Sequence, residues 1–245
     1  MKKLIFLFFG LLVLSSCSKT GDFELKIKAQ YKASPLVLTD AYQLGDLQIK
    51  FENLAFYMSD IALVNKDGEE TPLSEIEFIA LNSFDATGAE DGVTLRFLDL
   101  ASENFSKLKF GIGVPDDLNA KSPDDYNVED DLGQADFYWD AWSSYIFSKT
   151  EGSADTDGDG TFELKFFYHT GSDALFRSFE LETDIDIAAN ETTVLNLAID
   201  YDALLRNADN SYMDIEEFPR NHNPEDIGVI EQMVNNYQQA IKFEN

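Results

Sequence analysis

The chain has 245 residues, a formal net charge of −28 and 13% aromatic residues. So strong a negative charge repels phosphate backbones and attracts cations, which excludes nucleic acid as a partner. With 20 Phe and 10 Tyr, the chain is too rich in apolar side chains to be a disordered acidic tail. The composition therefore predicts a folded domain, most of whose carboxylates serve solubility.

The N-terminus predicts an exported lipoprotein. Two lysines precede an apolar run, residues 4–13, that is too short to span a bilayer. The run ends in Leu-Ser-Ser-Cys, the pattern after which a lipoprotein signal peptidase leaves a lipidated cysteine, here Cys17. The alternative is an ordinary signal with a chance cysteine. We expect a signal peptide over residues 1–16, a lipidated tether over 17–21 and one domain over 22–245.

Cys17 is also the only cysteine, which excludes a disulfide or a thiolate nucleophile in the rest of the mature chain. Acyl chains on a single N-terminal cysteine anchor a protein to one leaflet of the membrane and do not make it span the bilayer. No later stretch of the sequence is apolar enough to form a membrane-spanning helix. The expected location is the cell envelope, at the outer membrane, with the domain facing the periplasm or the surface.

Period-two alternation of apolar and polar residues over 23–31 predicts a half-buried strand. The same pattern recurs at 47–51, 108–114 and 162–168, and more continuous apolar strands are expected over 54–64, 76–81, 93–98, 137–147 and 193–199. Turn signals such as Lys66-Asp67-Gly68 separate them, which favours an antiparallel sandwich over βαβ units.

Two other segments stand apart from the strands. Residues 115–136 form a long loop rich in Asp and Asn, and loops of this length are usually functional or mobile. At the C-terminus, Asn223 and Pro224 suit the start of a helix, and apolar residues follow at helical spacing from Ile227 to Ile241. Its apolar face is expected to pack on the sandwich, with partner docking as the alternative. The predicted fold is an all-β, antiparallel Ig-like β-sandwich with a C-terminal amphipathic helix.

A calcium-loop pattern lies at 155–160, where three alternate aspartates precede a glycine at the sixth position. The twelfth position is Phe166, not a bidentate glutamate, which excludes a complete EF-hand. We expect a calcium-binding turn, with a solvated hairpin tip as the alternative. The candidate ligands are Asp155, Asp157, Asp159, the Thr161 carbonyl and Glu163.

Soft metal ligands are scarce. The chain has two histidines, His169 and His222, and Met58 and Met213 are among its few thioethers. Imidazole and thioether suit Cu(I), so a copper site must draw on this set. The alternative reading of His169, which lies in a predicted strand, is a hydrogen-bonded structural residue.

Trp139 and Trp142 lie in an aromatic segment. A strand would point the two indoles to opposite faces, one into the core and one exposed for carbohydrate stacking, cation–π contact or oxidation. The alternative places them in the sandwich core. The sequence contains no Gly-x-Ser-x-Gly, His-Glu-x-x-His or phosphate-loop motif, and we expect no enzymatic activity.

Five segments occur in this order along the chain: Phe56-Tyr57-Met58-Ser59-Asp60-Ile61, Phe110-Gly111-Ile112-Gly113-Val114-Pro115, Tyr138-Trp139-Asp140, Tyr145-Ile146-Phe147 and Phe167-Tyr168-His169-Thr170-Gly171. Together they resemble the MbnP-like family. The resemblance covers residues 22–243 and implies an envelope β-sandwich encoded near a di-haem protein of the cytochrome c peroxidase type. It also implies copper binding and oxidation of one tryptophan to kynurenine.

The resemblance places Trp139 on the first family tryptophan and Ala141 on the second, with Trp142 displaced by one. His169 and His222 match family histidines, whereas the histidine of the first family strand is missing from residues 23–31. We therefore expect Cu(I) at His169 and His222, with Met58, Met213 or an oxidised Trp139 as a weak third donor, and calcium as a brace. The alternatives are a surface interaction or carbohydrate-binding module and a redox substrate of a di-haem partner.

Overall fold

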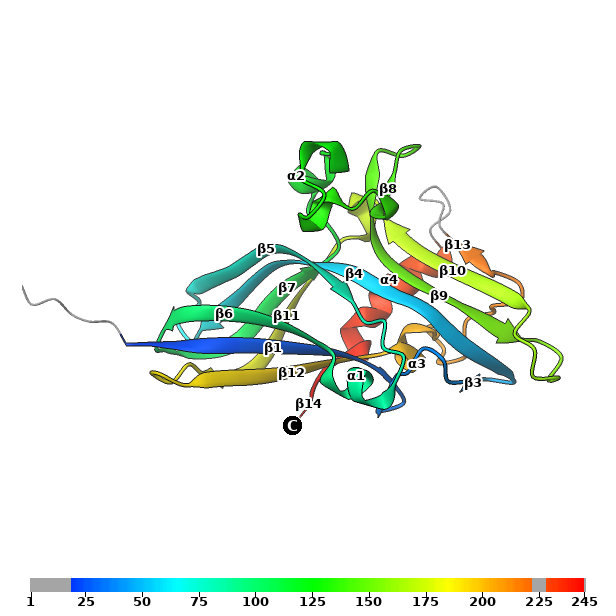
Figure 1. Cartoon of the computed structure of the whole chain (residues 1–245), viewed down its shortest axis with the longest axis horizontal. Coiled ribbons are helices and arrows are strands. Elements are labelled where there is room, and N and C mark those ends of the chain that lie inside the picture. Colours follow the sequence, from blue (N-terminus) through cyan, green and yellow to red (C-terminus); the bar gives the residue numbers. More distant parts are fainter. Residues whose placement is uncertain (1–18, 222–227, 245) are drawn as a thin grey trace, which may run out of the picture.

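The computed structural model describes residues 19–221 and 228–244, which form two packed β-sheets with a lobe on one of them (Figure 1). The smaller sheet has five strands and the larger has nine. The small-sheet strands are β1 (Thr20–Tyr31), β2 (Ser34–Pro35), β6 (Val93–Ala101), β12 (Thr192–Asp200) and β14 (Ile241–Glu244). The large-sheet strands are β3 (Tyr42–Leu44), β4 (Leu47–Asn65), β5 (Glu70–Ala80), β7 (Asn104–Ile112), β8 (Tyr138–Trp139), β9 (Ser144–Asp155), β10 (Leu164–Gly171), β11 (Arg177–Asp186) and β13 (Arg220–Asn221).

The all-β sandwich is confirmed. In β1 every second side chain is buried, because Phe23, Leu25 and Ile27 face the core while their neighbours face outward. Most pairings are antiparallel, but β1 runs parallel to β12 and β10 runs parallel to β13, so both sheets are mixed.

Strand β4 unites two predicted strands into one of 19 residues. Along it, Phe56 and Met58 enter the main core between the sheets, whereas Ala55 and Tyr57 enter a second apolar cluster on the other side. This alternation makes β4 the wall between the two cores. A bulge interrupts its ladder near Asp60, which has a φ of 50°.

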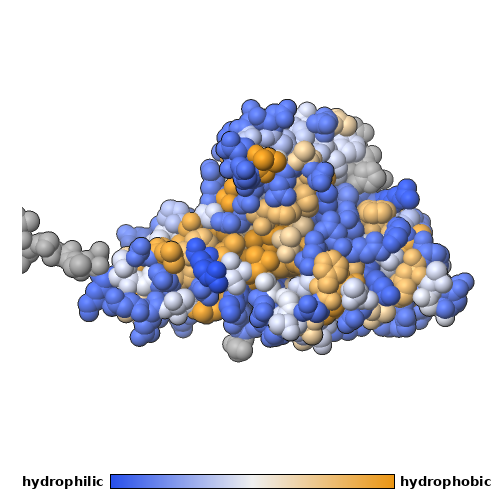
Figure 2. Space-filling view, in the orientation of Figure 1, coloured by the Kyte–Doolittle hydropathy of each residue, from blue (hydrophilic) through white to orange (hydrophobic). Residues whose placement is uncertain are grey.

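The second core lies under the lobe, residues 115–143, of which the sequence predicts residues 115–136 as a long loop. The lobe holds α2 (Asp116–Asn119) and three 3₁₀ turns, η1 (Pro123–Asp125), η2 (Asp131–Gly133) and η3 (Ala135–Phe137). Two buried tyrosines tie it to the sheet: the Tyr57 hydroxyl donates to the Asp131 carbonyl (3.1 Å) and the Tyr145 hydroxyl to the Leu132 carbonyl (2.8 Å). Figure 2 shows apolar side chains gathered beneath the lobe on the face in view.

The remaining helices are α1 (Ala86–Asp91), α3 (Tyr201–Leu204), α4 (Gly228–Ala240) and the 3₁₀ turn η4 (Asp173–Leu175). Met233 and Tyr237 of α4 are buried in the main core, so the helix packs on the sandwich as predicted. It ends at Ala240, since Ile241 begins β14; the predicted cap, Asn223 and Pro224, lies outside the described residues. Within the described ranges, the helices are all too short or too polar to cross a bilayer.

Candidate metal site

His169 lies on β10 with its side chain on the face away from the main core. Its neighbours Phe166 and Tyr168 are fully buried on the opposite face. The imidazole Nε2 lies 2.6 Å from Oε1 of Glu151 on the adjacent strand β9. Metal-binding histidines commonly have one ring nitrogen held by a carboxylate in this way, which fixes the ring and leaves ligation to the other nitrogen.

Glu151 is held in its charged form. Burial raises the pKa of this carboxyl, but hydrogen bonds from His169 and from Asn53, whose Nδ2 lies 3.1 Å away, outweigh burial and leave the pKa below its ordinary value. The site therefore offers a fixed negative charge next to the imidazole, which favours a bound cation.

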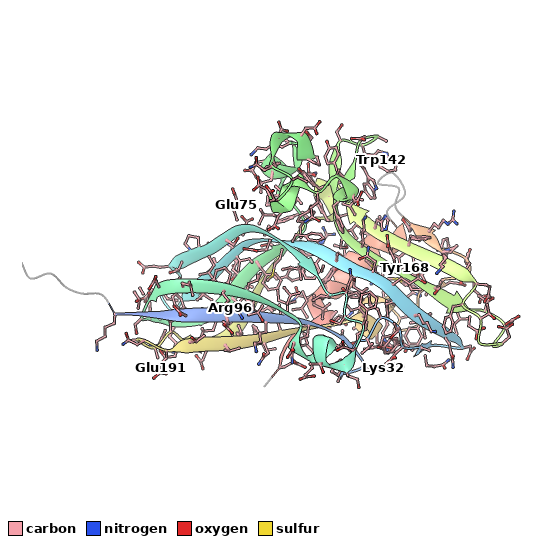
Figure 3. The ribbon with its side chains drawn as sticks, viewed as in Figure 1. Lys32, Glu75, Arg96, Trp142, Tyr168 and Glu191 are labelled. Atoms are coloured by element: carbon pink, nitrogen blue, oxygen red, sulfur yellow. The ribbon has the colours of Figure 1, made fainter. Side chains whose placement is uncertain are left out.

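Trp139 and Trp142 lie beside this pair on a turn. The predicted strand over 137–147 is wrong: η3 and β8 come first, a turn follows Trp139, and β9 begins only at Ser144. Because of the turn, the indoles do not point to opposite faces but pack edge to face, with ring centroids 5.0 Å apart. Trp142 is 38% exposed and Trp139 is half-buried. Figure 3 shows Trp142 at the lobe, above the part of the large sheet that contains Tyr168.

Trp139 connects the lobe to the histidine. Its ring centroid lies 6.4 Å from that of His169. A Cβ added at Gly171, which follows His169 by two residues, would lie 2.6 Å from Trp139 Cζ3, so only glycine leaves the indole its place. The two rings line a shallow pocket of about 500 Å³ together with Phe167 and Arg220.

The short strand β13 brings a distant part of the chain to the same place. It pairs in parallel with β10, matching Phe167 with Arg220 and Tyr168 with Asn221. The next residue after Tyr168 is His169, and the next after Asn221 is His222, which lies outside the described residues.

Neither methionine belongs to this pocket. Met58 is fully buried and Met213 is 4% exposed, both in the main core that also contains Tyr168. His169 faces the other side of the sheet. The prediction that Met58 or Met213 binds copper together with His169 is therefore wrong. Trp139, in contrast, packs against the second core on the side of His169.

The Asp155, Asp157 and Asp159 carboxylates converge at the tip of the β9–β10 hairpin, with one oxygen of each within 4.8 Å of the others. Asp155 is 4% exposed and accepts hydrogen bonds from the Gly158 and Gly160 amides at 2.7 and 2.8 Å. Both glycines have positive φ, 77° and 88°, which lets the turn fold around this carboxylate.

The other two predicted calcium ligands have different roles here. The Glu163 carboxylate accepts hydrogen bonds from both the amide and the hydroxyl of Thr156. The Thr161 amide donates to Asp159 Oδ1 at 2.7 Å. A pocket of about 360 Å³ at the turn is lined by Asp155 and Asp157 and, from the β3–β4 side, by Asp46 and Gln48.

Sequence reasoning missed Glu151 as a partner of His169. The alternation of half-buried Lys149 and Glu151 with buried Ser148 and Thr150 places Glu151 on the outer face. Its match to His169, however, depends on the hairpin register, which the aspartate turn between the two strands sets.

Two mixed sheets and a helix-bearing lobe define a β-sandwich domain. The sequence model of the MbnP family matches residues 20–223, and the chain belongs to this family. Among solved structures, MbnP from Methylosinus trichosporium matches with a TM-score of 0.54 and 12% identity, over 80% of this chain and 83% of that one, which shows a shared fold. No curated protein gives a significant match.

Proposed function

We propose that this MbnP-family chain is a lipid-anchored envelope protein that binds copper at His169 and is not an enzyme. The observation that supports copper most directly is the β10–β13 register. Tyr168 pairs with Asn221, the last described residue of β13, and His222 follows Asn221 in the sequence, so we propose His222 as the second ligand. Two imidazoles suffice to hold Cu(I).

The described residues fit such a site. Glu151 fixes one nitrogen of His169 and supplies negative charge, and Trp139 walls the ion from the lobe side. Arg220 lines the same pocket, and its guanidinium lies 5.9 Å from the Phe167 ring centroid. A bound copper ion would supply redox or Lewis-acid chemistry, and these residues would orient the imidazole and shield it.

Titration with Cu(I) under anaerobic conditions tests the proposal. Binding to the native state raises the melting temperature in proportion to the logarithm of ligand over Kd, and it should quench the emission of Trp139. His169→Ala should abolish both effects. An unchanged melting temperature and unchanged fluorescence in the native protein would refute copper binding.

A second candidate function is calcium binding at the hairpin tip, which the convergence of three carboxylates supports. Calcium should raise the melting temperature of the native protein, whereas Asp157→Asn should lose that response. Equal melting curves in calcium and in chelator would refute it.

The exposed edge of Trp142 supports a further candidate, a glycan-binding module, because exposed indoles stack on sugar rings. Binding to a glycan array that survives chelator and disappears in Trp142→Ala would favour it over copper. The di-haem partner of the cytochrome c peroxidase type remains a proposal as well. Intact mass of the protein from its native host tests it, since conversion of Trp139 to kynurenine changes the mass by a fixed amount.

A further inference from the structure

Several strand ends and loops lie together at the end of the sandwich where β1 begins. Thr20 pairs with Ala101, Phe105 with Asn65 and Asn104 with Asp186. These pairings bring together three loops, residues 66–69, 102–103 and 187–191, which we call the Thr20 end. Figure 1 shows β1, β6 and β12 meeting at this end, while the lobe with α2 and β8 rises near the middle of the long axis.

The chain is fixed to this end from its first described residue. The Lys19 carbonyl accepts a hydrogen bond from the Ser102 amide at 2.9 Å, and the Thr20 carbonyl accepts one from the Asn190 amide at 2.8 Å. Only Ser18 separates Lys19 from Cys17 in the sequence. Two Cα–Cα steps span roughly 7 Å at most, so a lipid on Cys17 must enter the bilayer close beside the three loops.

We infer that the Thr20 end rests on the lipid headgroups and that the sandwich stands on it, presenting the His169 pocket to the aqueous phase. This inference rests on the proposed lipidation of Cys17 and not on copper. Asn65 of β4 lies at the Thr20 end, and Ala55, ten residues earlier on β4, pairs with Lys149, which pairs with His169. At about 3.3 Å per residue, the pocket lies roughly 33 Å from the Thr20 end. The pocket therefore receives its ion or partner from solution rather than from the membrane.

Two properties of this end indicate the kind of lipid surface it fits. Leu98 and Val194, on the outer face of the small sheet near the end, are 65% and 45% exposed, and they offer apolar side chains to the interface. The loops are acidic, since Asp67, Glu69, Glu103 and Glu191 outnumber Lys66. Anionic lipid would repel these carboxylates, whereas the ammonium of phosphatidylethanolamine pairs with them.

Energy transfer from tryptophan to a dansyl group on the lipid headgroup tests the orientation. The lipidated full-length mature protein is reconstituted in phosphatidylcholine–phosphatidylethanolamine vesicles. Transfer from the native pair, Trp139 and Trp142, is compared with transfer from Ser102→Trp in a Trp139→Phe, Trp142→Phe background. Ser102 is exposed, so this substitution leaves the core intact. A matched control inserts ten Gly/Ser residues after Ser18.

The expected result is transfer from position 102 several-fold stronger than from the native pair, with most of that difference lost when the linker is inserted. Equal transfer from the two ends, or stronger transfer from the native pair, would overturn the standing orientation. A protein that fails to float with the vesicles would overturn the anchor and this inference together. Loss of copper binding leaves the prediction untouched, so the two proposals fail separately.

Discussion

Glu151 and His169 lie on neighbouring strands in diagonal register, with Oε1 2.6 Å from Nε2. This contact orients the only histidine that the structure describes, on the face of the sheet that also carries Trp139. The contact couples the hairpin to the pocket, because any change in the β9–β10 register would separate the two side chains.

Replacing the carboxylate should weaken copper binding without abolishing it. Glu151→Gln keeps a hydrogen-bond acceptor but loses the charge, and loss of such a supporting contact costs about 10- to 100-fold in metal affinity. Competition with a chromophoric Cu(I) chelator measures the change.

Met58→Leu is the matched control for this experiment. Met58 is fully buried on the other side of the sheet, and a volume-conserving exchange costs less than about 1.5 kcal/mol of stability. Its Cu(I) affinity should equal that of the native protein. A drop comparable to that of Glu151→Gln would contradict the exclusion of the Met58 thioether from the site.

Gly171→Ala should displace the indole of Trp139. The added Cβ would lie 2.6 Å from Trp139 Cζ3 and 2.9 Å from the Tyr145 carbonyl oxygen. We expect altered tryptophan emission and weaker Cu(I) binding, measured by fluorescence titration. Gly228→Ala is the control, since nothing lies within 4 Å of its added Cβ. Identical spectra for both variants would contradict the packing of Trp139 against Gly171.

We expect two different roles among the aspartates of the β9–β10 turn: Asp155 stabilises the turn, and Asp157 binds calcium. Asp155 holds two backbone amides from a buried position, so Asp155→Ala should destabilise the protein by about 1–3 kcal/mol even without calcium. Asp157→Asn, at an exposed position, should leave the stability in chelator unchanged and reduce only the calcium response. Urea unfolding with and without calcium distinguishes the two variants. Equal losses in chelator would argue against this division.

The ion pair of Asp202 is expected to stabilise the fold at neutral pH and to lose this contribution in acid. Burial raises its pKa, but hydrogen bonds from Arg206 (2.6 Å) and Tyr212 (2.7 Å) outweigh burial and leave the pKa below its ordinary value. A carboxyl with a lowered pKa stabilises the fold above its unfolded pKa, near 4, and this contribution is lost as the pH falls through the folded value.

Asp202→Asn should therefore lower the free energy of unfolding at pH 7 by about 1–3 kcal/mol. The difference from the native protein should shrink as the pH falls below about 4. Urea unfolding at several pH values measures it. Asp124→Asn, at an exposed position, is the control. A difference that stays constant from pH 7 to pH 3 would contradict the assigned pairing.

Local patterns in the sequence predict most strands, because alternation such as that of β1 reports burial directly. They do not predict that β1 pairs in parallel with β12, since that pairing joins residues far apart in the chain. Strand β11 escapes prediction because its acidic alternation, with Phe179 and Ile185 as its buried members, resembles a solvated loop.

The candidate site shows the same limit. The aspartate motif predicts the convergence of its three carboxylates, because a six-residue turn is local. The strand predicted over Trp139 and Trp142 is wrong, because a run of aromatic residues hides the turn that Ser143 makes with a φ of 48°. The methionines were candidates by chemistry alone, and only the tertiary structure separates Met58 from His169.

X-ray absorption at the copper edge of the Cu(I)-loaded protein tests the central claim most directly. The account predicts imidazole nitrogen neighbours, no sulfur neighbour, and loss of the bound copper in His169→Ala. A sulfur shell, or copper retained at full stoichiometry without His169, would contradict it.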